Sequence, residues 1–269
     1  MKRLIFLALI LCSSSAFAMV VQPVGASSQV LIPAAGSVQG AFGAFFRSDI
    51  TIVNLAGHDQ TVTLQWLPEA ATGQAASTTT IQIPALSGVR SSDFVSEFLH
   101  QTGLGSIIVT GTAPGGVGLD TTARLFVSSR IWTPISGGGP GTTSQSFPTI
   151  PVSTINTPIA AFFGTGGADN VSNYRVNIGI VNLDPVNAQT FVVQVASPPP
   201  VPPAKIVTLP PLTMEQVPLG NGLPVSAQLQ VQNVTSAATR SNFWTAYATS
   251  TDNSTNDSWS ELAVVGTTP

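Results

Sequence analysis

Apolar and polar residues alternate with a period of two along much of this chain. In the segment Gln60–Trp66 the alternation places Val62, Leu64 and Trp66 on one face, and Thr78–Ile83 continues the same pattern. A period of two is typical of a β-strand with one buried face. Gly and Pro clusters separate these runs, as turns between strands require. The pattern predicts a chain built mostly of short strands.

One short segment has a helical period instead. Within Asp93–His100 the apolar residues fall on a single stripe of a helix: Phe94, Val95, Phe98 and Leu99. Ser92 or Asp93 is suited to cap the N-terminus of such a helix. We therefore expect a short helix in a loop between two strands.

An internal repeat is the strongest long-range feature of the sequence. Arg47–Leu55 recurs without a gap as Arg175–Leu183, and six of the nine positions are identical. Gln189–Ala196 then matches the strand that begins at Gln60, and Ala227–Val231 matches the strand at Ser106. A repeat at this spacing indicates two copies of one β-rich unit.

The composition between the copies suggests where they meet. Residues 137–150 are rich in Gly, Pro and Ser, so we expect a linker or a loop without regular structure there. The flanking units are then repeat 1 at residues 19–136 and repeat 2 at residues 151–269. The chain therefore divides into two units of similar length.

Each copy is expected to fold as an antiparallel β-sandwich. Long helices are missing from the pattern, so the crossover connections of a parallel sheet are not available. Antiparallel strands with one apolar face bury that face on a second sheet, and the sequence predicts two tandem immunoglobulin-like sandwiches. A barrel or a jelly roll is the alternative.

The repeated strand is apolar on both of its faces. Ile50 and Ile52 point to one side, and Val53 and Leu55 point to the other side together with Arg47. We expect the Val/Leu end of the second face to be covered as well, with the other copy as a candidate cover.

The first 18 residues have the features of an export signal. Lys2 and Arg3 precede an apolar run, and Ala16–Ala18 forms a small-x-small cleavage site. Cleavage there gives a mature chain that begins at Met19 and lacks the only cysteine, Cys12. We expect a secreted, periplasmic or cell-surface protein that is held together by its core alone, without disulfides.

Charge is scarce and slightly acidic. With Lys2 and Arg3 in the signal peptide, seven basic residues remain against twelve acidic ones, which gives a net charge of −5. Such a chain has no electrostatic basis for binding nucleic acid, and no mature segment is apolar enough to cross a membrane. Extracellular protein or polysaccharide is the expected kind of partner.

Arginine opens the repeated strand in both copies. Arg47 and Arg175 are expected to have structural roles, either stacked on a neighbouring ring or paired with a carboxylate. Asp120 is the candidate partner for the first and Asp252 for the second.

Candidate binding residues are few. The oxygen-rich run that starts at Asp252 could hold Ca²⁺ through Asp252, Asn253 and Asp257, although Asn and Asp also fill hairpin turns. Trp132 and Trp259 lie near strand ends and are candidates for sugar binding, whereas the other two tryptophans, Trp66 and Trp244, are expected in the core. No cofactor other than this possible calcium ion is expected.

Catalytic patterns do not appear. The two histidines have no metal-binding spacing, and no Gly-x-Ser-x-Gly elbow occurs. The four glutamates stand in non-equivalent places and mark no acid–base pair. We therefore expect a protein without enzymatic activity.

Several segments resemble a known group of proteins. They are Phe46–Asp49, Val127–Thr133, Arg175–Leu183 and Ala246–Asp257. Together they are similar to secreted bacterial proteins with duplicated immunoglobulin-like β-sandwich repeats, and the similarity covers most of the mature chain. The resemblance implies secretion and tandem sandwiches, and it brings no catalytic or binding residue with it.

These observations favour a structural or adhesive role. We expect a secreted, non-enzymatic β-sandwich protein that contacts extracellular macromolecules at the cell surface. A carbohydrate-binding accessory module is the alternative, and a secreted hydrolase is the least favoured reading.

Overall fold

The computed structural model describes residues 25–40, 43–135, 140–163, 174–196, 203–221, 223, 227–253 and 258–266. The expected signal peptide at residues 1–18 lies outside these ranges. Nearly all regular structure in the described chain is antiparallel β-sheet, which confirms the all-β class. No helix among the described residues has the length and apolar character that a bilayer span requires.

Repeat 1 forms two layers. Its strands are β1 (Gln29–Gln39), β2 (Phe45–Asn54), β3 (Gln60–Pro68), β4 (Ser77–Ile83), β5 (Gly88–Ser91), β6 (Gly103–Thr112), β7 (Leu125–Pro134), β8 (Thr142–Phe147) and β9 (Ile150–Pro151). One layer has the order β4-β3-β6-β1-β9, and in the other layer β2 pairs with β5 on one side and with β7 on the other, followed by β8. The end of β1 also pairs with β2, which joins the two layers at one corner.

Repeat 2 has the same pairings strand for strand, except that the described residues of its first two strands do not pair as β1 and β2 do. Its strands are β10 (Ile159–Phe163), β11 (Tyr174–Asn182), β12 (Gln189–Ala196), β13 (Lys205–Leu209), β14 (Thr213–Asn221), β15 (Gln228–Asn233), β16 (Trp244–Asp252), β17 (Ser258–Leu262) and β18 (Val264–Gly266). They form the sheets β13-β12-β15-β10-β18 and β14-β11-β16-β17.

The strand order differs in part from that of immunoglobulin domains. The central pairs β2·β5 and β3·β6 correspond to the B·E and C·F pairs of that fold. The first strand, however, lies beside β6, and β7 lies beside β2, so these two strands stand in exchanged positions. The antiparallel sandwich is confirmed, and the immunoglobulin-like topology is not.

The connections follow the sequence expectations with two exceptions. The expected helix is α1 (Phe94–Leu99), which buries Phe94, Val95 and Leu99. Its N-cap residue, Asp93, makes no capping hydrogen bond with its side chain, whose Oδ2 instead accepts from Ser37 Oγ and pairs with Arg47. Residues 137–150 are also not free of regular structure, since β8 pairs with β7 along the second layer.

Each sandwich has its own apolar core. In repeat 1 the inner side of β2 packs Ile50 and Ile52 against β3, whose Val62, Leu64 and Trp66 are all fully buried. In repeat 2 the equivalent strand packs its inner isoleucines against β12 and β15, and Trp244 lies in this core. The alternation read from the sequence therefore identified the inner faces correctly.

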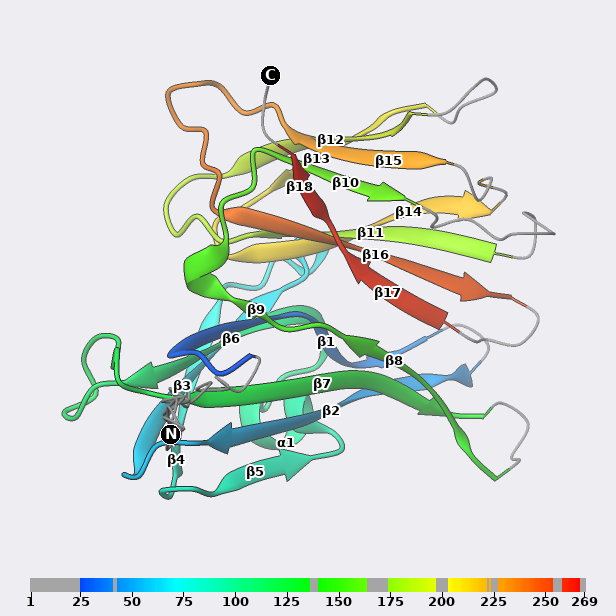
Figure 1. Ribbon diagram of the computed structural model, residues 1–269. Coiled ribbons are helices and arrows are strands. Elements are labelled where there is room, and N and C mark those ends of the chain that lie inside the picture. Colours follow the sequence, from blue (N-terminus) through cyan, green and yellow to red (C-terminus); the bar gives the residue numbers. More distant parts are fainter. Residues whose placement is uncertain are drawn as a thin grey trace, which may run out of the picture.

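The two sandwiches stack face to face through a third apolar cluster (Figure 1). The outer face of the β3-β6-β1 layer packs against the outer face of the β14-β11-β16 sheet. From bottom to top in Figure 1, the molecule is a stack of four β-layers. Val181 and Leu183 are fully buried in this interface, which confirms that the other copy covers them, whereas Val53 and Leu55 in repeat 1 are only half-buried.

A buried asparagine fixes the same turn in both repeats. Asn54 donates from Nδ2 to the backbone oxygens of His58, Ile83 and Pro84, and its Oδ1 accepts from the Ala56 N–H. In repeat 2, Asn182 makes the corresponding four bonds. Both side chains are fully buried. The repeated asparagine therefore ties the turn after one strand to the end of a distant strand in each copy.

A glycine in the repeated strand makes room for an aromatic ring at the interface. Gly179 lies under Tyr247, and a Cβ atom at this position would lie 1.9 Å from the ring carbon Cζ. Tyr247 is fully buried and meets Phe147 of repeat 1 edge to face, with ring centroids 5.5 Å apart. Repeat 1 has Thr51 and Ser128 at the equivalent pair of positions.

Removing the asparagine clamp should destabilise the fold. Asn54→Ala and Asn182→Ala each leave buried carbonyl groups without a donor, so each should lower the free energy of unfolding by about 1–3 kcal/mol. Urea denaturation followed by tryptophan fluorescence measures the change. Asn242→Ala removes an exposed asparagine side chain and is the matched control. Equal stability of the three variants would contradict the structural role of the clamp.

Filling the space under Tyr247 should weaken the stacking of the repeats. Gly179→Ala forces the ring to move, at a cost of about 1–3 kcal/mol in the free energy of unfolding. Gly57→Ala is the control, because a Cβ atom there meets no other atom within 4 Å. The same denaturation experiment decides the point, and a Gly179→Ala variant as stable as the control would show that Tyr247 is not held in this position.

Candidate functional site

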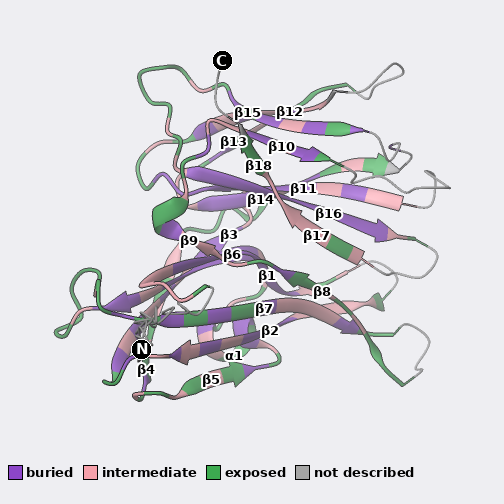
Figure 2. Cartoon of the chain, in the orientation of Figure 1, coloured by how far each residue is buried: buried purple, intermediate pink, exposed green. Residues whose placement is uncertain are grey.

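One outer sheet face of repeat 1 is not covered by repeat 2. It belongs to the β5-β2-β7-β8 layer, and Figure 2 shows exposed residues along β5 at this side of the molecule. We call it the arginine face and define it by five residues: Arg47, Asp49, Arg90, Arg130 and Trp132. Three of the seven basic residues in the segment 19–269 therefore lie on one face.

A buried carboxylate organises two of these arginines. Asp49 is only 6% exposed. Arg90 binds it with both ends of its fork, from Nε to Oδ1 at 2.9 Å and from Nη2 to Oδ2 at 2.8 Å. Arg130 binds the same Oδ2 from Nε and Nη2, both at 2.9 Å. The two guanidinium groups therefore lie side by side on one oxygen.

The charges in this triad do not cancel. Two guanidinium groups face one carboxylate, so one positive charge is left uncompensated. The hydrogen bonds from Arg90 lower the pKa of the Asp49 carboxyl below its ordinary value. Burial of the carboxyl acts to raise this pKa, and Arg130 acts to lower it further. The side chains of Arg90 and Arg130 are 65% and 43% exposed, and their bonds to Asp49 do not use the Nη1 groups. The triad thus presents ordered donors to solvent.

Arg47 lies next to the triad and stacks on aromatic rings. Its guanidinium carbon is 4.6 Å from the ring centroid of Phe45 and 5.5 Å from that of Trp132. Its Nε is 3.5 Å from Oδ2 of Asp93. The partner expected from the sequence was Asp120, and this expectation was wrong. Asp120 accepts a hydrogen bond from Thr122 and lies near His58 instead. A cation between two rings is held in place by the ring quadrupoles as well as by the carboxylate.

The equivalent face of repeat 2 has neutral residues at the three triad positions, although it keeps an arginine, Arg175, at the position of Arg47. The strand registers place Asn177 at the position of Asp49, Gln216 at that of Arg90 and Thr249 at that of Arg130. That face is the one buried against repeat 1. Burying unpaired charge is costly, which favours neutral residues at the triad positions where the face is covered.

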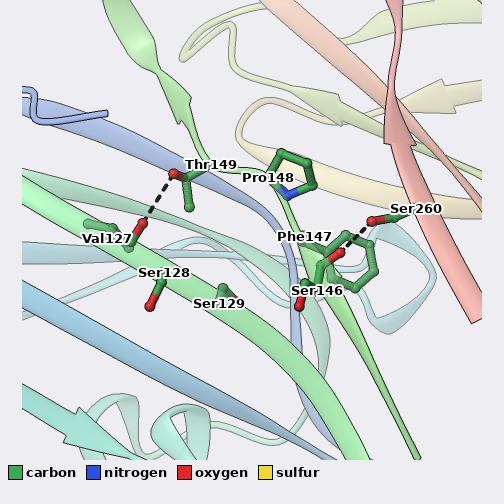
Figure 3. Close-up of a pocket in the computed structure, with 8 residues that line it drawn as sticks. All are labelled: Val127, Ser128, Ser129, Ser146, Phe147, Pro148, Thr149 and Ser260. Carbon is green, nitrogen blue, oxygen red and sulfur yellow. Dashed lines mark hydrogen bonds between the residues drawn. The ribbon is translucent and has the colours of Figure 1, made fainter. Parts of the chain in front are cut away.

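A hollow of about 360 Å³ opens between β7, the end of β8 and β17 of repeat 2 (Figure 3). Ser129 and Phe147, which line it, alternate with Arg130 and Ser146 along their strands, so the hollow lies on the opposite side of the layer from the arginine face. Five of its eight lining residues carry hydroxyl groups, namely Ser128, Ser129, Ser146, Thr149 and Ser260, and none is titratable. Ser146 stands opposite Arg130 in the β7–β8 ladder, and the hydroxyl of Ser260 from repeat 2 donates to its backbone oxygen at 2.5 Å. Ser129 Oγ is buried and has no hydrogen-bond partner among the described residues. The hollow can therefore hydrogen-bond a polar ligand, but it has no general acid or base.

A second hollow lies on the other side of the interface between the repeats. It is lined by Ala70, Gly73, Gln74, Ala75, Ala76, Pro185, Pro210, Pro211, Leu212 and Thr213. Glu69 and Glu215 come together nearby, and burial, followed by the charge of Glu215, raises the pKa of Glu69. Neither glutamate lines either of these two hollows.

The calcium candidates are only partly described. Asp252 ends β16 and Asn253 follows it, whereas Asp257 lies outside the described residues. Asn253 Oδ1 accepts from Arg175 Nη1 at 2.5 Å, next to the expected partner Asp252. A guanidinium at this oxygen disfavours a metal ion on the same atom, and no group of three His, Cys, Asp or Glu residues in the described chain is arranged to hold one. Calcium binding stays a prediction.

The two candidate sugar-binding tryptophans have different surroundings. Trp132 is half-buried on the arginine face, and its Nε1 donates to the backbone oxygen of Ser92 at 2.8 Å. Trp259 is 38% exposed on β17 of repeat 2 and rests against Tyr174. Only Trp132 has exposed cations beside it.

The Asp49 triad was not foreseen from the sequence. Asp49 and Arg90 are 41 positions apart, and Asp49 and Arg130 are 81 apart, so no local spacing marks them. The usable signal was the repeat itself, in which an aspartate in one copy is replaced by Asn177 in the other.

A scan against models of protein families and a search among curated proteins give no match to this chain. The functional conclusions below therefore depend on the chain's own geometry.

The triad should contribute stability only while Asp49 is ionised. Asp49→Asn should lower the free energy of unfolding by about 1–3 kcal/mol at pH 7, because the charged hydrogen bonds are lost. Since the pKa of Asp49 is lowered in the folded protein, this contribution should persist at mildly acidic pH and disappear as pH falls through that lowered pKa. Urea denaturation at pH 7 and at about pH 2 measures both values.

Asp59→Asn is the control for this experiment, because the Asp59 side chain is exposed. A stability difference between wild type and Asp49→Asn that persists unchanged to the lowest pH would show that the effect comes from packing and not from charge.

Proposed function

We propose that this protein is an exported, non-enzymatic adhesive or structural module, and that the arginine face is its contact surface for extracellular macromolecules. The observation that carries the proposal is the difference between the two copies of this face. Where the face is covered, the triad positions hold the neutral residues Asn177, Gln216 and Thr249, and Tyr247 packs beside them. Where it is free, it displays the Asp49 triad and the stacked Arg47.

Rigidity supports this assignment. The exposed arginines of the triad are held by a carboxylate that is itself buried, so little side-chain entropy is lost when they bind a partner. Arginine and tryptophan are also the residue types that contribute most at binding interfaces. A flat sheet face with fixed donors suits an extended partner better than a small molecule in a deep pocket.

The test uses a variant that copies the covered repeat. The triple variant Asp49→Asn, Arg90→Gln, Arg130→Thr gives repeat 1 the neutral set found in repeat 2, so its strands should still pair. Labelled protein without the signal peptide is applied to intact source cells and their extracellular matrix, and bound protein is quantified. We expect binding to fall by about tenfold or more in the triple variant, because charge-assisted hydrogen bonds are lost.

Arg124→Gln is the matched control, because it removes the same net charge from an exposed residue outside this face. Attachment of the triple variant at the wild-type level would refute the arginine face as the contact surface.

A further inference from the structure

The junction between the two repeats contains a carboxyl group, that of Glu69, which repeat 2 covers. We propose that ionisation of Glu69 weakens the contact between the repeats, so that the stack is held more firmly in acidic surroundings than in alkaline ones. The junction is separate from the arginine face, so this pH-sensitive contact is independent of the proposed function.

Glu69 is fixed at the free edge of a repeat 2 sheet. It follows β3, and its backbone N–H donates to the backbone oxygen of Leu104 in β6 at 3.0 Å, which holds it to repeat 1. An isolated parallel bridge joins it to Met214 of β14, the edge strand of the β14-β11-β16-β17 sheet. The next residue, Ala70, packs against the core of repeat 2. A short piece of repeat 1 therefore lies along the edge of repeat 2 at this point.

The surroundings of the Glu69 carboxyl disfavour its charge. Burial is the largest cause that raises its pKa above the ordinary value, and the charge of Glu215 raises it further. A hydrogen bond from the Gln216 backbone acts to lower this pKa but does not reverse the shift. Tyr247 is fully buried close by, and burial followed by the charge of Glu69 raises the pKa of its hydroxyl. The carboxyl therefore faces a buried ring and a second acid.

No cation in the described chain neutralises Glu69. The described residues of β3, β6 and the helical turn 70–72 contain no titratable side chain. The titratable groups of the other neighbouring elements are Glu215 on β14, Tyr247 and Asp252 on β16, Lys205 on β13 and Asp184 in the turn before β12. Lys205 donates to the backbone oxygen of Pro218, further along β14. An ionised Glu69 is therefore not balanced by the elements packed around it.

Opening of the junction releases Glu69 from these surroundings. The residues that bury it or charge its environment belong to repeat 2, namely Glu215, Gln216 and Tyr247. Separation of the repeats therefore returns the carboxyl to water. Since the closed junction holds the proton more tightly than the open one, a rise in pH favours opening.

The sign and the range of the effect follow from the direction of this shift. The stability that protonated Glu69 gives to the junction is fully present below the ordinary carboxyl pKa, and it is lost as pH rises through the raised pKa. The apolar cluster around Val181 and Leu183 does not titrate and keeps the repeats together at any of these pH values. Ionisation therefore changes how often the junction opens, and the fold of each sandwich persists.

Two adjacent alanines of β1 can report on opening. Ala34 packs in the apolar cluster between the repeats, whereas Ala35 packs in the core of repeat 1. Residues 19–269 contain no cysteine, so Ala34→Cys and Ala35→Cys each introduce a single thiol into this segment. The rate of reaction with a dipyridyl disulfide is measured for both at about pH 5 and about pH 8. Dividing the first rate by the second removes the effect of pH on the thiol itself.

We expect the ratio of the Ala34→Cys rate to the Ala35→Cys rate to rise by about threefold or more between these two pH values. Adding Glu69→Gln to both variants should abolish the rise, because the amide cannot ionise. Glu97→Gln is the matched control, since it makes the same exchange at an exposed residue of α1 and should leave the rise intact. A ratio that does not change with pH, or a rise that survives Glu69→Gln, would overturn the inference.

Urea denaturation of cysteine-free protein gives a second readout that does not depend on the introduced thiols. Glu69→Gln should unfold at a higher urea concentration than wild type at about pH 8 and at nearly the same concentration at about pH 5. A structural role for the Glu69 side chain alone would instead make the variant less stable at both pH values. That result, or a difference from wild type that is the same at both pH values, would refute the role of ionisation.

Discussion

Covering a sheet that is apolar on both faces stabilises it, and this interaction holds the two repeats together. The repeated strand has isoleucines on one side and a Val/Leu pair on the other. In repeat 2 both sides are covered, the first by the sandwich core and the second by repeat 1, which buries Val181 and Leu183 completely. The stack of four layers follows from satisfying this one sheet, because its two faces need two different partners.

The same interaction explains how the copies have diverged. Burial between the repeats disfavours a cluster with unbalanced charge, and repeat 2 has neutral residues at the three triad positions, with Gly179 and Tyr247 packed beside them. A face that stays in solvent is under no such pressure, and in repeat 1 it holds the Asp49 triad. The duplicated turn was not free to diverge, because Asn54 and Asn182 serve buried backbone groups in both copies.

Sequence patterns identified most strands, including the largely buried β6 and β11, but not β1. Residues 60–66 alternate cleanly, and β3 is where the pattern places it. β1 is buried on nearly all sides and contains Pro33 at a shift in register, so it shows no alternation despite its central place. The triad joins side chains from β2, β5 and β7. Its formation depends on tertiary pairing, which a single sequence does not display.

The junction between the sandwiches joins two unlike faces, so the molecule has a direction. One end presents cations and aromatic rings around Arg130, and the other presents uncharged amides such as Gln194 and Gln230, which bond each other at 2.6 Å. A head-to-tail junction has no twofold axis, in contrast to that of a symmetric dimer. If one end of the molecule is attached to a surface, the chemically different end faces outward. A molecule of this kind connects two different materials.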